Sequence, residues 1–215
     1  MKIVVNEIFQ SIQGEGPGTG KPSVFIRLGG CNLTCRWCDS KFAWHTKYQD
    51  NHVMSVETVI DRIKSYPCNH LVITGGEPLL QQKEIEVILK KLPNHTAELE
   101  TNGSITCDIK KHLTQINCSP KLSGSGNKPY PLRIKPTNKK VIFKFVVSKK
   151  SDLNEIDQYV RKYKIPKSKA YLMPEGVEKS GIEKRSKWLV ELCKKEGYNF
   201  TTRLHILLYG NQRKK

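Results

Sequence analysis

The chain has 215 residues, 37% hydrophobic and 8% aromatic, with a net charge of +17, and no run of about 18 apolar residues predicts a membrane span. The N-terminal residues turn polar early without a small-residue cleavage pattern, and the seven cysteines are an odd number, so neither a signal peptide nor a disulfide framework is expected. We therefore expect a cytoplasmic protein whose clustered thiols bind a ligand.

Apolar runs typical of buried strands alternate along the chain with segments of helical spacing. Strands are predicted over residues 2–9, 23–30, 70–74, 97–101, 141–147 and 169–174. Helices are predicted over residues 55–66, 83–92, 152–163 and 182–197. Ser55 is a candidate N-cap of the first helix, and Gly197 is a candidate C-cap of the last.

This alternation of strands and helices predicts an α/β fold with a parallel sheet. Six strands and four helices are too few for an eight-unit barrel, which typically needs about 250 residues. We therefore predict a partial, TIM-like βα barrel with few helices, forming a single domain over residues 1–215. Residues 122–140 are rich in Ser, Gly, Pro and Lys without periodicity, and they are predicted to form an irregular insertion.

Motifs that could carry chemistry follow three of the predicted strands. Cys31, Cys35 and Cys38 come after the second strand, "GGEP" (75–78) after the third and "ETNG" (100–103) at the end of the fourth. Parallel sheets place ligands at the carboxyl ends of their strands. The sequence therefore predicts that these segments line one site.

The spacing C-x3-C-x2-C leaves several kinds of ligand open. Zinc would need a fourth ligand such as His45, but structural zinc sites usually take two separated ligand pairs. Buried or redox-active thiols are another reading, although three in one glycine-flanked loop are unusual. A 4Fe–4S cluster is held by cysteine thiolates, and three cysteines would leave one iron open to a substrate or cofactor.

The cysteine loop, with Trp37 directly before its last cysteine, resembles the radical S-adenosylmethionine superfamily, and "GGEP" resembles that superfamily's second motif. The segments "NEIFQSIQGEGPGTGKPSVFIRLGGCNLTCRWCDS", "TGGEP", "SPK" and "RLHILLYGNQRKK" resemble the 7-carboxy-7-deazaguanine synthase family. The resemblance runs from residue 6 to the end of the sequence, but residues 122–140 and 148–200 are only generally similar.

This resemblance implies a lyase that converts 6-carboxy-5,6,7,8-tetrahydropterin to 7-carboxy-7-deazaguanine and ammonia, upstream of queuosine. It implies a 4Fe–4S cluster, S-adenosylmethionine and Mg2+ as cofactors, and a homodimer that takes electrons from an acidic donor such as flavodoxin or ferredoxin. Two alternatives stay open: a radical activase of a glycyl radical enzyme, and a non-catalytic iron–sulfur electron carrier or nucleic-acid-binding module.

Net charge bears on the choice of partner. Residues 1–109 carry 11 Lys or Arg and 12 Asp or Glu, whereas residues 110–215 carry 26 and 8. A basic half is compatible with nucleic acid, but the basic residues are scattered and few aromatic residues lie among them. A lysine-rich solvated surface explains the same count, so we expect no specific nucleic-acid partner.

The resemblance also assigns roles to individual residues. The implied substrate-binding residues are Ile12, Gln13, Gly14, Glu15, Arg27, Thr74 and His205. Those implied for S-adenosylmethionine are Trp37, Cys38, Asp39, Gly76, Ser119, Pro120 and Lys121. The implied metal ligands are Cys31, Cys35 and Cys38 for the cluster and Ser40 for Mg2+.

Two of these residues have a plainer interpretation. Arg27 could alternate outward from its strand to solvent, and His205 could be a packed residue within an apolar run. Ser40 stands where the family usually has Thr, which keeps the hydroxyl oxygen but removes a methyl group. The family pattern "WGN" is "YGN" at residues 209–211, which preserves an aromatic residue.

Overall fold

The computed structural model describes residues 1–47 and 50–215. The strands are β1 (Lys2–Ile12), β2 (Pro22–Leu28), β3 (His52–Ser55), β4 (His70–Gly75), β5 (Thr96–Thr101), β6 (Gln115–Cys118), β7 (Val141–Val147), β8 (Ala170–Pro174) and β9 (Asn199–Phe200). The α-helices are α1 (Val56–Lys64), α2 (Gln82–Lys90), α3 (Asp152–Lys162), α4 (Lys179–Glu196) and α5 (Leu204–Tyr209). No helix in these described ranges is both long and apolar enough to cross a membrane.

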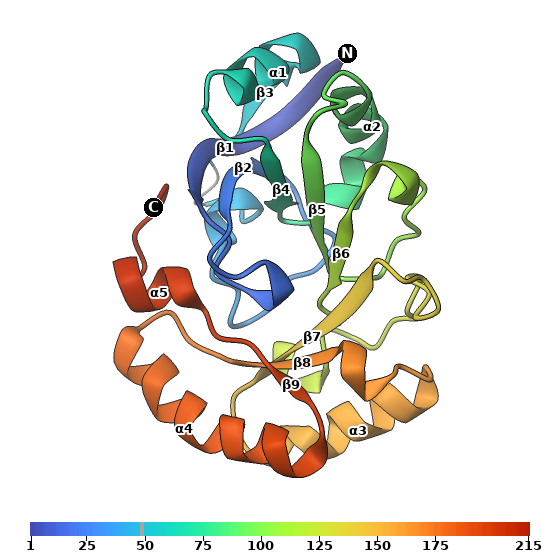
Figure 1. The fold of residues 1–215 in the computed structure, drawn as a ribbon, viewed down its shortest axis with the longest axis vertical. Coiled ribbons are helices and arrows are strands. Elements are labelled where there is room, and N and C mark those ends of the chain that lie inside the picture. The colour runs from blue at the N-terminus through green and yellow to red at the C-terminus, as the bar shows by residue number, and fades with distance from the viewer. Residues whose placement is uncertain (48–49) are drawn as a thin grey trace.

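All of these strands join one curved sheet in the order β3-β1-β2-β4-β5-β6-β7-β8-β9 (Figure 1). The pairs β3–β1 and β1–β2 are antiparallel, and every pair from β2–β4 to β8–β9 is parallel. Because β3 and β9 are the two edges, the parallel run curves without closing. This confirms the predicted partial βα barrel.

Side chains alternate strictly between the two faces of the parallel strands, as the two-residue period of a strand requires. In β7, Phe143 and Phe145 pack into the hydrophobic core beneath the helices, whereas Lys144 and Val146 line the interior pocket. In β2, the same alternation sends Arg27 into the pocket. The polar interior of the barrel therefore follows from single polar residues placed inside apolar runs.

The helices lie outside the sheet, with α1 and α2 at the end that holds the N-terminus and α3 and α4 at the opposite end (Figure 1). The predicted caps are confirmed. The Ser55 hydroxyl accepts a hydrogen bond from Thr58 N at 3.0 Å, and Gly197 ends α4 with a left-handed φ of 74°.

All six predicted strands and all four predicted helices are present, but β3, β6, β9 and α5 escaped prediction. Strand β6 has only four residues, and Gln115 and Asn117 project their polar side chains toward one another at 3.0 Å inside the sheet. It therefore lacks the apolar run that identified the other strands. Strand β9 has two residues and carries no periodicity.

Candidate active site

A pocket of about 260 Å³ opens at the carboxyl ends of the parallel strands. It contains every residue predicted for substrate, cofactor or metal except Pro120, which is buried beside it and lines a smaller neighbouring hollow with Trp37. The residues placed in the pocket are Ile12, Gln13, Gly14, Glu15, Arg27, Cys31, Cys35, Trp37, Cys38, Asp39, Ser40, Thr74, Gly76, Ser119, Lys121 and His205.

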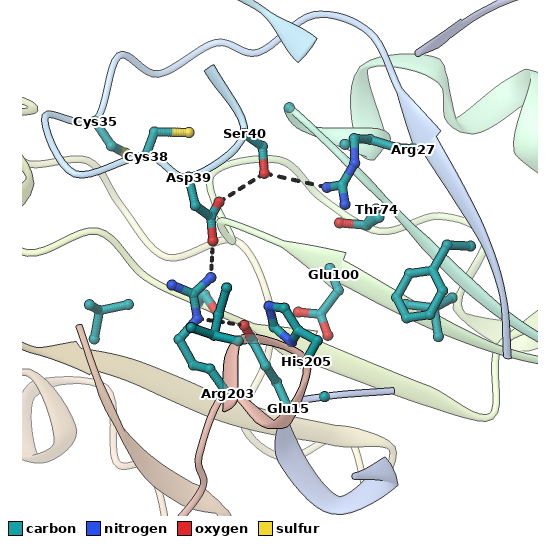
Figure 2. A pocket seen from close by; sticks show the side chains of 18 of the residues that line it. Glu15, Arg27, Cys35, Cys38, Asp39, Ser40, Thr74, Glu100, Arg203 and His205 are labelled. Atoms are coloured by element: carbon teal, nitrogen blue, oxygen red, sulfur yellow. Dashed lines mark hydrogen bonds and ion pairs between the residues drawn. The ribbon is translucent and has the colours of Figure 1, made fainter. Parts of the chain in front are cut away.

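The cysteine loop lies at one side of this pocket (Figure 2). It follows β2 and turns through a hydrogen bond from Cys38 N to Cys35 O at 3.2 Å. Cys35 is buried, while Cys31 and Cys38 are half-buried. Burial raises the pKa of the Cys31 thiol to about 11, so at neutral pH this side chain becomes a thiolate only when it binds a metal.

The "GGEP" loop packs directly against the cysteine loop. Gly76 N donates to Leu28 O at 3.1 Å, and Glu77 N donates to Gly30 O at 2.9 Å. A Cβ atom on Gly76 would lie 2.0 Å from Gly30 O, so only glycine allows this approach. These bonds leave the two loops in fixed contact at the end of the pocket.

Glu77 itself does not line the pocket and holds two chain segments together, residues 77–79 and 101–102. Its fully buried carboxylate accepts hydrogen bonds from Leu79 N at 3.0 Å, Thr101 Oγ1 at 2.8 Å and Asn102 N at 2.7 Å. Burial raises the pKa of this carboxyl group, and the three donors oppose that effect. Glu77 thereby fixes the end of β5, and with it the "ETNG" segment, beside "GGEP".

A cluster of charged side chains lines the same pocket, and Glu15, Asp39, Glu100 and Arg203 of this cluster are labelled in Figure 2. Lys144 Nζ is 2.7 Å from Glu15 Oε2 and 2.7 Å from Glu100 Oε2. Arg203 Nε is 3.1 Å from Glu15 Oε1, and its Nη2 pairs with Asp39. We call these five residues the charged cluster; it joins β5, β7, the loop after β1, the cysteine loop and the segment before α5.

The two carboxylates that share Lys144 differ in pKa because only one has a second cation. Burial opposes ionisation of Glu15, but Lys144 and Arg203 together hold its pKa well below the usual range. Burial raises the pKa of Glu100, which Lys144 only partly offsets. Glu15 is therefore the firmly ionised member of the pair.

Arg27 forms a second charged group with the C-terminal segment. Its Nε donates to Glu7 Oε2 at 3.1 Å, and Arg213 Nε lies 2.6 Å from the other oxygen of the same carboxylate. The Phe42 ring centre lies 5.6 Å from the Arg27 guanidinium and 4.1 Å from that of Arg213. We call Arg27 and Arg213, together with Glu7, the arginine pair. Arg27 is only 18% exposed, so the alternative of a solvent-facing arginine is wrong.

Ser40 connects the two charged groups. Its hydroxyl accepts from Arg27 Nη1 at 3.3 Å and donates to Asp39 Oδ1 at 2.8 Å (Figure 2). Asp39 in turn pairs with Arg203. Ser40, two residues after Cys38, thus bridges the two sides of the pocket.

Gln13 belongs to a polar network below the charged cluster. Its Nε2 donates to Glu98 Oε2 at 3.0 Å, and its Oε1 accepts from Glu15 N at 3.3 Å. Asn117 Nδ2 and His70 Nε2 also contact the Glu98 carboxylate, at 3.1 and 3.0 Å. The resemblance implied that Gln13 binds substrate, but this residue is 3% exposed and its side-chain amide is already paired at both ends.

His205 packs on Gly14 at the edge of the pocket. A Cβ atom on Gly14 would lie 2.1 Å from His205 Nδ1, and Leu204 N donates to Gly14 O at 2.9 Å. Burial lowers the pKa of His205 to about 4, so its imidazole is neutral at physiological pH. His205 therefore lines the pocket as an uncharged polar group, which differs from a residue packed wholly inside an apolar core.

The comparisons with known proteins agree with this geometry. Residues 25–121 match the Radical SAM superfamily. The chain is 36% identical to 7-carboxy-7-deazaguanine synthase from Pyrobaculum aerophilum, covering 100% of this chain and 98% of that protein. It is also 36% identical to the enzyme of the same name from Hyperthermus butylicus, covering 95% and 92%. The crystal structure of QueE from Escherichia coli covers 95% of both chains with a TM-score of 0.75 at 27% identity.

The chain belongs to the 7-carboxy-7-deazaguanine synthase family. It is therefore a radical S-adenosylmethionine enzyme, and that superfamily implies a 4Fe–4S cluster and S-adenosylmethionine. The predicted alternatives, an activase and a non-catalytic iron–sulfur or nucleic-acid-binding module, are not favoured by these relatives.

The cysteine loop fits the cluster of this family better than it fits zinc. Within residues 1–47 and 50–215, no three His, Cys, Asp or Glu side chains are grouped as ligands of one metal ion. A 4Fe–4S cluster makes a different demand, because each cysteine binds its own iron atom. Cys31, Cys35 and Cys38 all line the pocket from one loop, which suits separate irons of one cluster.

Several residues of this family member's pocket were not identified from the sequence, namely Glu7, Glu100, Lys144, Arg203 and Arg213. Lys144 had a usable signal, because it is a single charge inside the apolar run "VIFKFVV", as Arg27 is inside "SVFIRLGG". Glu100 belongs to "ETNG", a pattern that is equally typical of a strand followed by a turn with no ligand-binding role. Arg203 and Arg213 have no such pattern around them, since the carboxylates with which they pair lie more than 160 residues away.

Proposed function

We propose that this pocket is the active site of a radical S-adenosylmethionine lyase, in which different parts of the wall hold the cofactor and the substrate. The enzyme converts 6-carboxy-5,6,7,8-tetrahydropterin to 7-carboxy-7-deazaguanine and ammonia, within a single domain. One observation carries the proposal: a three-cysteine loop and a "GGEP" loop face two opposed charged groups in one pocket, in a chain related to these synthases over its full length. The cytoplasm is the compartment we propose.

Cys31, Cys35 and Cys38 would hold the cluster, leaving one iron for S-adenosylmethionine. When bound and reduced, the cluster and S-adenosylmethionine together supply the carbon-centred radical that removes a hydrogen atom from the substrate. The chain would hold S-adenosylmethionine between the two loops and the end of β6. The residues proposed for this are Trp37, Cys38, Asp39, Gly76, Ser119, Pro120 and Lys121.

Two contacts support this placement of S-adenosylmethionine. Lys121 Nζ lies 5.5 Å from the centre of the Trp37 ring, so these side chains form a cation–π wall beside the cysteine loop. The backbone near Lys121 is fixed because Tyr130 OH accepts from Lys121 N and donates to Asn102 O, each at 2.9 Å. The wall is therefore rigid before any cofactor binds.

Arg27 would bind the carboxylate of the pterin, because a guanidinium fork matches a carboxylate in both geometry and charge. Its Nε is committed to Glu7, which leaves Nη2 and the shared Nη1 for substrate. Thr74 pairs with Arg27 in the β2–β4 register, so its hydroxyl lies at the same level of the pocket.

The amino and N–H edge of the pterin would meet the charged cluster. Glu15 is ionised and Glu100 lies beside it, so both can accept from donors on the substrate. Gln13 supports Glu15 through its backbone N, and Ile12, Gly14 and His205 close the adjacent wall. Neutral His205 adds a hydrogen-bonding group without adding charge.

Mg2+ would bind at Ser40, since this cation prefers oxygen ligands and commonly retains water and substrate oxygens. The Ser40 hydroxyl lies between Arg27, the proposed carboxylate site, and Asp39. A cation there would share the substrate carboxylate with Arg27. Binding would require the Ser40 hydroxyl to exchange its present hydrogen bonds for the metal.

An acidic flavodoxin or ferredoxin is the proposed electron donor, and the protein is proposed to act as a homodimer. The excess of 26 basic over 8 acidic residues in positions 110–215 supports this donor, because complementary charge accelerates encounter. Donor-driven turnover should slow steeply as salt rises, whereas dithionite-driven turnover should change little. Donor-driven rates indifferent to salt would contradict this part of the proposal.

The direct test is anaerobic reconstitution with iron and sulfide, followed by incubation with S-adenosylmethionine, reductant and 6-carboxy-5,6,7,8-tetrahydropterin. We expect a brown protein with about four irons per chain and formation of 7-carboxy-7-deazaguanine, detected by mass. Cys35→Ala should fail to hold an intact cluster, while Cys68→Ala, outside the pocket lining, should retain it. A wild-type protein that binds zinc and stays colourless would refute the proposal.

A further inference from the structure

Each sulfur of the cysteine loop accepts one hydrogen bond. Leu33 N donates to Cys31 Sγ at 3.4 Å, which is a contact within the loop itself. The other two donors are side chains. Asn127 Nδ2 lies 3.1 Å from Cys35 Sγ, and Trp44 Nε1 lies 3.2 Å from Cys38 Sγ.

The Asn127 donor comes from the irregular segment 122–140, 92 positions away from Cys35. The segment is docked on the cysteine loop by its backbone, because Arg36 N donates to Ser125 O at 2.9 Å. A Cβ atom on Gly126 would lie 2.6 Å from Arg36 Nε, and Gly126 has a left-handed φ of 80°. Close docking therefore depends on glycine next to Asn127.

The orientation of the Asn127 amide is fixed by a second contact with the same loop. Thr34 N donates to Asn127 Oδ1 at 3.0 Å, so the oxygen faces Thr34. The amide nitrogen must then face the opposite way, where it reaches Cys35 Sγ and Ser125 Oγ at 3.1 Å each. One side chain thus both orders the loop and donates to a sulfur.

N–H donors to cysteine sulfur are one of the main controls on the reduction potential of an iron–sulfur cluster. A reduced cluster carries one more negative charge than an oxidised one, and part of this charge resides on the thiolate sulfurs. A donor therefore stabilises the reduced form more and raises the potential. Removing a donor lowers the potential.

We propose that Asn127 and Trp44 are positioning residues that set the reduction potential of the cluster, and that segment 122–140 presents Asn127 to Cys35. This inference rests on the proposed function only in requiring that the cysteine loop hold a cluster. It gives the irregular segment a role: its docking controls how readily the cluster accepts the electron that starts each turnover.

The test is a redox titration of reconstituted holoenzyme, followed by the EPR signal of the reduced cluster. Asn127→Asp keeps the oxygen that accepts from Thr34 N but replaces the donor with a carboxylate oxygen, whereas Asn127→Leu removes both contacts without adding charge. Trp44→Phe removes only the second donor. We expect each variant to shift the one-electron equilibrium about tenfold toward the oxidised form, or 59 mV.

Asn32→Asp is the matched control for added charge. Asn32 lies in the same loop, but its amide contacts Ser104 and Asn102, with no sulfur among these partners. Asn127→Asp should shift the potential more than Asn32→Asp, which adds the same charge without removing a donor to sulfur. The shifts of Asn127→Leu and Trp44→Phe should add in the double variant. Iron content near wild type shows that the loop still holds the cluster.

Unchanged potentials in Asn127→Leu and Trp44→Phe, with iron content intact, would overturn the inference while leaving the proposed function standing. An Asn127→Asp shift matched by Asn32→Asp, with no shift in Asn127→Leu, would also overturn it, since charge alone would then explain the effect. A wild-type protein without any cluster would instead refute the proposed function itself.

Discussion

Lys144 is the residue whose loss tests the charged cluster most directly. Its side chain is 1% exposed, and its Nζ lies 2.7 Å from both Glu15 and Glu100. Lys144→Met keeps most of the aliphatic volume and removes the charge. The variant leaves two carboxylates, 16% and 19% exposed, side by side with only Arg203 to compensate them.

The expected cost follows from these contacts. Removing one partner of a buried ion pair typically destabilises a protein by about 3–5 kcal/mol, because the remaining charge is left uncompensated. Glu15 retains Arg203, so Glu100, whose pKa is already raised by burial, should take up a proton in the variant. Protonation of Glu100 removes one uncompensated charge, so the variant should lose less unfolding free energy at low pH than at neutral pH.

The sign of the pH dependence is therefore fixed. In the folded variant, the pKa of Glu100 lies further above its unfolded value, so folding binds a proton that the unfolded chain has released. The destabilisation relative to wild type should be smallest below the unfolded pKa of the carboxyl group and should grow as pH rises. Glu100→Gln in the same chain should remove this growth and restore part of the stability.

Anaerobic urea unfolding of holoenzyme at several pH values, with kcat/KM for the pterin, measures both effects. Lys194→Met is the control, since Lys194 pairs with Glu191 on the surface where both side chains are mostly exposed. Lys144→Met should cost far more than this control at neutral pH. A loss no larger than that of Lys194→Met, or no rescue by Glu100→Gln, would refute the reasoning.

Three further perturbations test the rest of the pocket. Arg27→Ala should raise KM for the pterin about 100-fold or more without loss of cluster iron. Arg213→Ala should raise KM less, because Arg27 would then neutralise Glu7 alone. Equal kinetics for wild type and Arg27→Ala would place the substrate carboxylate elsewhere. Ser40→Thr should keep stimulation by Mg2+ and Ser40→Ala should lose most of it, and a like response of both to Mg2+ would mean that Ser40 is no ligand. The folded pKa of His205 is about 4, so its stabilising contribution is present above the ordinary value of 6.5 and is lost as pH falls toward 4. The wild type should therefore lose roughly 3 kcal/mol more unfolding free energy over this range than His205→Gln. Parallel stability curves for the two proteins would contradict the lowered pKa.

The interior side of each predicted strand was accessible from the sequence because strand alternation is strict. Arg27 and Lys144 occupy equivalent interior positions within apolar runs, and the same rule places both in the pocket. Arg27 was identified because a resemblance drew attention to it, whereas the identical pattern around Lys144 went unused. The physical signal was equal in the two cases.

Contacts between distant segments could not be predicted in this way. Arg203 meets Asp39 across 164 positions, and Asn127 meets Cys35 across 92. Neither Arg203 nor Asn127 lies in a periodic strand or helix, so no local pattern fixes its direction. Their positions are set by the curvature of the open sheet and by the docking of an irregular segment, both of which are tertiary events.

The polarity of the pocket follows from an unequal number of positive and negative side chains in each of its two charged groups. In the arginine pair, two guanidinium groups share the single carboxylate of Glu7, which leaves an excess positive charge. In the charged cluster, two cations face three carboxylates, which leaves an excess negative charge. Glu7 and Lys144, at the centres of the two groups, are each 1% exposed, so solvent screens these imbalances only weakly until a ligand completes them. The proposed substrate carries a 6-carboxylate at one end and a row of N–H donors at the other, so one molecule in one orientation would complete both sides at once.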